Sequence, residues 1–113
     1  MSVLVSRISL IIAAGGAVSS AGILGGRVPT VLQMPDTWTA ATISFAGTGD
    51  SLNYYFIFKE DGLLLNIPAD VNNRIILPSQ YFSDHQGIMI CSGTRDAPVN
   101  QAAARVLYLE AWE

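Results

Sequence analysis

The last strand-forming run of the chain, Arg105 to Trp112, places the strongest constraint on its fold. The run reads RVLYLEAW, is rich in β-branched and aromatic residues, and contains no glycine or proline. It follows a loop of turn-forming residues that starts at Ser92. Because a strand at the end of a chain has no successor to hold it, it has to pair with strands formed much earlier. The sequence therefore predicts a fold that depends on a long-range contact of its final strand.

Short β-prone runs separated by turn signals occupy most of the remaining chain. In the opening run, Ile8, Leu10 and Ile12 fall on one face, and Gly15-Gly16 ends the strand. We expect further strands at residues 17–24, 27–34, 38–46, 54–59, 63–67, 74–77 and 87–91, and a helical turn or loop at 78–82. About eight or nine short strands, without a long amphipathic helix, are typical of an antiparallel sandwich or barrel. We predict an all-β fold, a single antiparallel β-sandwich of jelly-roll or immunoglobulin-like type.

For two of these strands, the sequence predicts which side chains point toward the core and which toward water. In the 38–46 strand, Trp38, Ala41, Ile43 and Phe45 share one face opposite Thr42 and Ser44, which indicates a half-buried strand. We interpret Trp38 as a residue that caps the core. In the 54–59 strand, alternation places Phe56 and Phe58 toward the core and Tyr55 toward water. Residues 60–62, Glu-Asp-Gly, give the hairpin signal that joins this strand to 63–67.

The length of 113 residues predicts one domain, residues 1–113. Its first 26 residues imitate a secretory signal peptide, but the basic region is poor and the apolar run is shorter than the roughly 20 residues of a membrane-spanning helix. We therefore predict no membrane span and interpret this segment as strands. It is also a candidate arm that contacts a neighbouring protein.

The composition indicates a partner for part of the apolar surface. Half of the residues are hydrophobic and only 13% are charged, about half the usual share. Both alternating sets of the first strand are largely apolar, so its second face needs a cover. Arg7 and Arg27 precede the first acidic residue, Asp36, which is compatible with docking on an acidic neighbour and also with chance. The predicted interface residues are Val3, Leu4, Val5, Arg7, Arg27 and Trp112.

The sequence argues against several other partners. A net charge of −3 with scattered basic residues disfavours nucleic acid, which requires clustered lysines and arginines. Cys91 is the single cysteine and has no cysteine or histidine at metal-ligand spacing, so we expect a small buried hydrophobe. We predict no cofactor and no metal.

The residues that could act in catalysis or in sugar binding are better interpreted as structural. His85 is the only histidine, and we expect an exposed loop residue rather than a catalytic base. The glycine pairs Gly15-Gly16 and Gly25-Gly26 do not precede helices and lack the lysine of a phosphate-binding loop, so we interpret them as turns and predict no nucleotide site. The scattered loop aspartates lack the spacing of a calcium loop. The aromatic run at 54–58 is interpreted as core in preference to a sugar-stacking platform.

Three segments carry a resemblance to a known family. The runs MPDTWTAATISF, NYYFIFKEDGLLL and SGTRDAPVNQAAARVLYL together resemble small structural proteins in the particles of tailed bacteriophages and prophages. The matching positions are Pro35, Trp38, Thr39, Ala40, Ala41, Phe45, Asp61, Gly62, Ser92, Gly93, Thr94, Ala97, Pro98, Val99, Asn100, Gln101, Ala102, Ala103 and Arg105. The resemblance implies that all of them are structural.

The resemblance further implies a non-enzymatic role in the virion, after assembly in the host cytoplasm. The expected function is that of a capsid cement or decoration protein, or of a head or tail appendage. The expected partners are other virion proteins, such as the major capsid, connector or tail proteins, and further copies in a homo-oligomer such as a trimer. The alternative is a carbohydrate- or host-receptor-binding sandwich of a fibre. A small hydrolase is disfavoured because the sequence offers no nucleophile and base pair.

Overall fold

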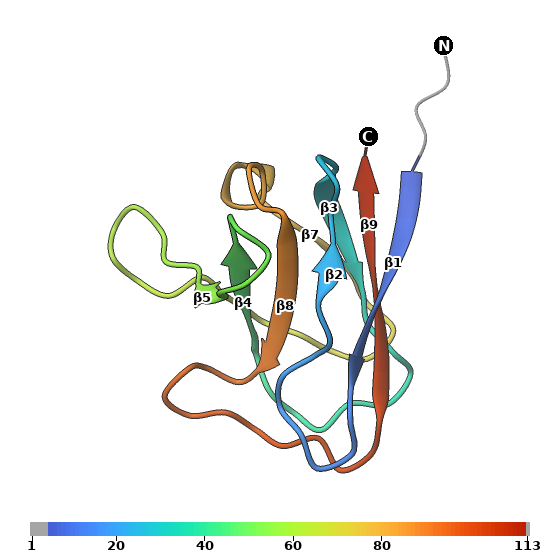
Figure 1. Ribbon diagram of the computed structural model, residues 1–113. Helices are drawn as coiled ribbons and strands as arrows, with labels where there is room; N and C mark the ends of the chain where they lie inside the picture. Colours follow the sequence, from blue (N-terminus) through green and yellow to red (C-terminus); the bar gives the residue numbers. More distant parts are fainter. Residues whose placement is uncertain (1–4, 113) are drawn as a thin grey trace.

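The structure, a computed structural model, describes residues 5–112 and arranges nine strands in two antiparallel sheets (Figure 1). Sheet A has the order β1-β9-β3-β7, and sheet B has the order β2-β8-β4-β5 with β6 also paired to β4. The elements are β1 (Val5–Ile12), β2 (Gly22–Ile23), β3 (Val28–Gln33), β4 (Ile43–Thr48), β5 (Tyr55–Phe56), β6 (Asn66–Ile67), β7 (Arg74–Ile76), the 3-10 helix η1 (Ser79–Tyr81), β8 (Gly87–Ser92) and β9 (Arg105–Trp112). The predicted antiparallel sandwich is confirmed.

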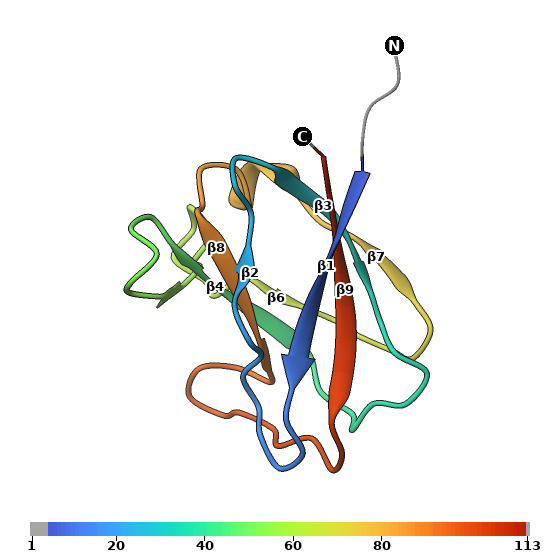
Figure 2. The same ribbon diagram turned by 45° about the vertical axis from the view of Figure 1, so that its right-hand side comes forward.

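The final strand lies inside its sheet rather than at an edge. β9 pairs with β1 along its whole length, from Val5 opposite Trp112 to Ile12 opposite Arg105. On its other side β9 pairs with β3, with a register shift between Pro29 and Val31. Figure 2 shows β9 between β1 and β3. The long-range contact expected of the last strand is therefore confirmed.

The core lies between the inward faces of the two sheets. Leu10 and Ile12 of β1 and Leu107 and Leu109 of β9 are fully buried, as strand alternation requires. The inward side chains of sheet B are Ile43, Phe45, Ile88 and Ile90. The ring of Phe45 meets that of Phe82 edge to face, with 4.9 Å between the ring centroids. The core thus joins residues from the first and last strands.

Four predicted strands are shorter than expected, and two of them, 54–59 and 63–67, are reduced to β5 and β6. Of residues 17–24, only β2 is a strand, with single bridges at Val18 and Ser19. The 38–46 strand begins at Ile43, and every residue of β4 is buried, so the prediction of a half-buried strand was wrong. On the outer face, Ser44 Oγ donates a hydrogen bond to the Gly93 carbonyl at 2.9 Å, so the start of the loop after β8 lies against β4.

The hairpin at residues 60–62 forms, but its flanking aromatic residues face the opposite way from the prediction. The Lys59 amide donates to the Leu63 carbonyl at 2.8 Å, which closes the turn. Phe56 lies opposite Ala46 on the outer side of sheet B, and Ile57 packs against the core instead. Phe58 is exposed. A shift of one position in register exchanges the two faces of a strand, and here pairing with β4 sets it.

The connections at residues 13–21, 34–42 and 93–104 gather at the end of the sandwich opposite the chain termini (Figure 1). This end is called the basal end below. Gly15 and Gln101 meet there, since the Gly15 amide donates to the Gln101 carbonyl at 2.8 Å. Residues 5–26, the described part of the candidate arm, contribute β1, β2 and the buried Leu24 to the sandwich.

Candidate functional site

The outward side chains of sheet A form the first candidate site, called the outer face of sheet A. Strand alternation turns every second residue of β9 outward, and the neighbouring strands place their own outward residues beside them. Its described members are Arg7, Ser9 and Ile11 of β1, Val28, Val31 and Gln33 of β3, Arg74 and Ile76 of β7, and Val106, Tyr108, Glu110 and Trp112 of β9.

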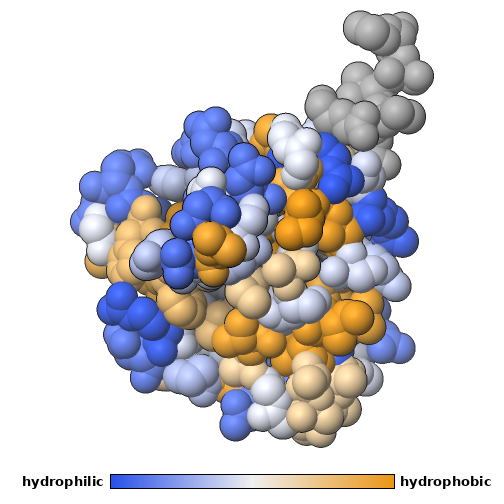
Figure 3. Space-filling view, viewed as in Figure 1, coloured by the Kyte–Doolittle hydropathy of each residue, from blue (hydrophilic) through white to orange (hydrophobic). Residues whose placement is uncertain are grey.

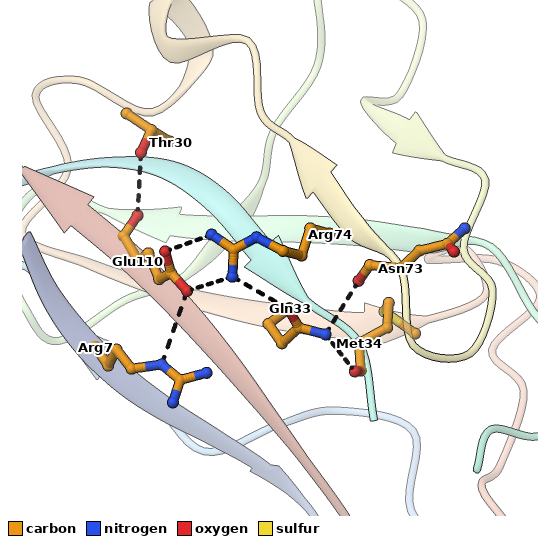
Figure 4. Close-up of polar contacts among 7 residues, drawn as sticks. All are labelled: Arg7, Thr30, Gln33, Met34, Asn73, Arg74 and Glu110. Carbon is orange, nitrogen blue, oxygen red and sulfur yellow. Dashed lines mark hydrogen bonds and ion pairs between the residues drawn. The ribbon is translucent and has the colours of Figure 1, made fainter. Parts of the chain in front are cut away.

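Glu110 is the centre of a charged cluster on this face (Figure 4). Arg74 binds its carboxylate through two hydrogen bonds, from Nη1 to Oε2 at 2.8 Å and from Nη2 to Oε1 at 2.7 Å. Arg7 approaches from the other side, with Nε 3.8 Å from Oε2. The hydrogen bond from Arg74 lowers the pKa of Glu110, so the carboxylate stays charged at neutral pH.

Two neighbouring side chains fix the arginines of the cluster. Gln33 Oε1 accepts a hydrogen bond from Arg74 Nη1 at 3.2 Å. The guanidinium of Arg7 lies over the ring of Tyr108, 4.3 Å from its centroid, in cation–π geometry. Two arginines face one carboxylate, so the centre of the face carries a net positive charge on a chain whose total charge is −3.

Exposed apolar side chains surround the charged cluster. Ile11 and Val106 lie opposite each other on β1 and β9, and both are exposed. Ile76 on β7 is 76% exposed, and Trp112 at the other end of β9 is 42% exposed. Large apolar side chains around a positively charged centre are suited to a protein neighbour with apolar and acidic groups.

The structure places the predicted interface residues in different parts of the molecule. Arg7 and Trp112 lie on the outer face of sheet A, and the backbone of Val5 pairs with that of Trp112. Arg27 lies in the connection before β3, where its guanidinium donates to the carbonyls of Ile23 and Leu24 at 2.7 and 2.6 Å and braces the turn. Val3 and Leu4 lie outside the described residues.

Sequence reasoning missed the other members of the outer face. Glu110 and Tyr108 share a face with Trp112 at spacings of two and four residues, a signal that the sequence contains. Arg74 joins them only because β7 pairs with β3, which no local pattern indicates.

A second apolar surface lies over sheet B. Figure 3 shows apolar residues across the middle of the face seen in Figure 1, over β2 and β8, bordered by hydrophilic loops. Val18 and Ile23 are exposed there. Val18 lies opposite Cys91, which is buried, and burial raises the pKa of the Cys91 thiol. The expectation of a buried cysteine is confirmed.

The predicted structural motif residues converge at the basal end, apart from Asp61 and Gly62 at the hairpin tip. Gly93 has φ +88°, and a Cβ there would lie 2.5 Å from the Ala97 carbonyl oxygen, so the tight turn requires glycine. Gly93 bridges to Pro98, and the Thr94 hydroxyl accepts from the Ala97 amide at 3.1 Å. This end also contains four further motif residues, Trp38, Ser92, Gln101 and Arg105.

Gln101 is fully buried, and its side chain makes four hydrogen bonds. Its Oε1 accepts from the Thr39 amide at 2.8 Å and from Arg105 Nε at 3.0 Å. Its Nε2 donates to the Thr39 carbonyl at 3.0 Å and to Ser92 Oγ at 2.8 Å. Trp38 packs against the core beside this network and donates its indole proton to the Ala41 carbonyl at 3.1 Å.

His85 is half-buried, so the prediction of an exposed loop residue was wrong. Its Nε2 donates to the Tyr81 carbonyl at 3.0 Å, since a carbonyl oxygen can only accept. The ring packs against the backbone of Gly47 in β4, where a Cβ would collide with it. The imidazole is therefore held by packing and by a hydrogen bond to the backbone.

The exposed side chains of Tyr55 and Phe58 are together called the aromatic surface below. Tyr55 is 71% exposed, which agrees with its predicted contact with water, although its pairing with Gly47 places it on the opposite face of sheet B from Phe56. Phe58 is exposed, with the Arg95 guanidinium 5.2 Å from its ring centroid. Asp50 caps the nearby turn by accepting from the amides of Leu52 and Asn53, and these bonds lower the pKa of its carboxyl group.

Comparison with known proteins leaves the family open. No protein-family model, curated protein or solved structure matches the chain. Among residues 5–112, no group of three histidine, cysteine, aspartate or glutamate side chains is placed to hold a metal ion. The same part of the chain has no helix with the length and apolar character needed to cross a membrane.

Proposed function

We propose that this protein is a non-enzymatic structural component of a tailed-phage particle, a cement or decoration protein that binds neighbouring capsid subunits. The observation that carries the proposal is the outer face of sheet A, where exposed apolar residues surround the Arg7–Glu110–Arg74 cluster. The three sequence runs that resemble virion proteins support the same role.

The fold suits this role because the interface residues stand on a rigid support. Trp112, Val106 and Glu110 belong to the strand at the centre of sheet A, whose alternate residues fill the core. The backbone of these residues is held by a strand on each side, so a partner that binds this face causes little further loss of conformational entropy. The second apolar surface, at Val18 and Ile23, gives the protein another outward face for a neighbour. Contacts on more than one face suit a protein that joins several subunits, including its own copies.

Recovery in purified particles tests the role. We expect the chain in a fixed ratio to the major capsid protein. Trp112→Ser and Ile76→Asp are expected to lower that ratio while the domain remains folded. Leu52→Ser, which removes an 82% exposed leucine from the β4–β5 connection, is the matched control and is expected to leave it unchanged. Absence of the wild-type chain from particles, or a turnover activity lost in His85→Ala, contradicts the proposal.

A fibre module that binds carbohydrate is the second candidate function, and the exposure of Tyr55 and Phe58 is the observation that favours it. A glycan array separates the two. Specific glycan binding that Tyr55→Ala abolishes, with the fold intact, supports the fibre module, whereas binding to capsid subunits alone supports the cement protein.

A further inference from the structure

The basal end contains a buried arginine without an acidic partner. Arg105 lies at the start of β9 on the face that points into the sandwich, and it is only 9% exposed. Among residues 5–112, no carboxylate oxygen lies within 4.0 Å of its guanidinium. Arginines this deeply buried are normally paired with an anion, because removing the charge from water is costly.

Neutral groups surround the guanidinium instead. Its Nε donates to Gln101 Oε1 at 3.0 Å, Nη1 donates to Thr37 Oγ1 at 2.8 Å, and Nη2 donates to Thr39 Oγ1 at 3.2 Å. Gln101 has no capacity left, because its amide also binds Thr39 and Ser92. These bonds orient the arginine but leave its charge uncompensated.

The two threonines connect this charge to the surface. Both hydroxyls act as acceptors in the bonds that the described residues make: Thr37 Oγ1 accepts from Arg105, and Thr39 Oγ1 accepts from Arg105 and from the Ala102 amide at 3.1 Å. Each hydroxyl retains a proton to donate, and acceptance from a cation strengthens that donation. Thr37 and Ala102 are exposed, so an anion can approach.

We propose that Thr37 and Thr39, backed by Arg105, form a binding site for a carboxylate of a neighbouring protein chain. The two hydroxyls accept from the two terminal nitrogens, Nη1 and Nη2, of one planar guanidinium, so two donors stand next to one positive charge, and a carboxylate offers an oxygen to each. The site lies at the basal end, opposite the chain termini, and it does not depend on the virion role or on the outer face of sheet A.

Titration with acetate, followed by NMR, tests this site at constant ionic strength with chloride as reference. We expect saturable shifts of the Thr37, Thr39 and Ala102 amides and of the Arg105 Nε–H signal. Thr37→Val is expected to weaken acetate binding roughly tenfold, since one hydrogen bond to a charged group is lost. Thr37→Ser retains the hydroxyl and is expected to bind as the wild type does. Thr37 is exposed, so water can replace its hydroxyl as an acceptor for Arg105 in Thr37→Val, whereas Arg105→Leu would remove three hydrogen bonds of the basal end.

Two short peptides identify the source of the carboxylate. A peptide with one glutamate is expected to shift the same signals, and its glutamine counterpart is not. Shifts that match those caused by chloride, or that persist unchanged in Thr37→Val, overturn the site. Tighter binding of inorganic phosphate than of either carboxylate probe overturns the assignment to a carboxylate.

Discussion

The contact between His85 and Gly47 predicts an unusual cost for adding a single methyl group. A glycine replaced by alanine in a compatible backbone conformation normally gains about 0.4–1 kcal/mol, because the unfolded chain loses freedom. Gly47 is not among the glycines with a positive φ, so its backbone tolerates alanine. The added Cβ, however, would collide with the His85 ring.

The ring has little room to yield, since Nε2 is hydrogen-bonded to the Tyr81 carbonyl at 3.0 Å. Overpacking of this kind costs about 1–3 kcal/mol. We therefore expect Gly47→Ala to destabilise the protein by about that amount. Gly49→Ala is the matched control, because a Cβ there meets nothing within 4 Å, and it is expected to be neutral or slightly stabilising.

Urea denaturation of four proteins measures the effect: the wild type, Gly47→Ala, His85→Ala and the double variant. Removal of the ring opens the space, so Gly47→Ala is expected to cost little in the His85→Ala background. Equal costs of Gly47→Ala in both backgrounds would show that the ring does not occupy this position, and the account of His85 as a packed structural residue would then be wrong.

Three further predictions concern sheet A and the aromatic surface. Leu109→Ala is expected to lower the free energy of unfolding by about 2–5 kcal/mol. Val106→Ala, on the opposite face of the same strand, should change it by less than about 0.5 kcal/mol. Similar losses for the two variants in denaturation curves would contradict the register of β9. Because Arg74 lowers the pKa of Glu110, the stability from this carboxylate is present above the ordinary glutamate pKa of about 4.3 and is lost as the pH falls through the lowered folded-state value. Glu110→Gln should therefore reduce the acid-dependent loss of stability below about pH 4.3, and an unchanged profile of melting temperature against pH would refute the coupling. Tyr55→Ala should leave the affinity for capsid subunits unchanged. A loss of affinity, measured by calorimetry, would show that the capsid contact involves the aromatic surface instead of the outer face of sheet A.

Local sequence patterns predicted the strands better than they predicted the surfaces. The terminal run was identified as a strand held by early partners because it lacks glycine and proline, and β9 lies between β1 and β3. The orientation of Phe56 was predicted wrongly, because pairing with Ala46 sets the register and a run of consecutive aromatic residues does not reveal it.

The candidate sites depend on which strands become neighbours, and that order is not written in any local pattern. Arg74 meets Glu110 across β3, although they are 36 positions apart in the chain. At the basal end, the inward positions of Leu107 and Leu109 imply that Arg105 also points inward, so alternation alone could have indicated a buried charge. Its threonine partners come from the connection before β4, and only Thr39 of the two lies in the strand predicted at 38–46.

A reconstruction of the native phage particle tests the proposed role most directly. The account predicts density for this chain bound to capsid subunits, with Ile76, Trp112 and the Arg7–Glu110–Arg74 cluster covered by a neighbour. A particle that lacks the chain, or one in which the outer face of sheet A is fully exposed to solvent, would contradict it.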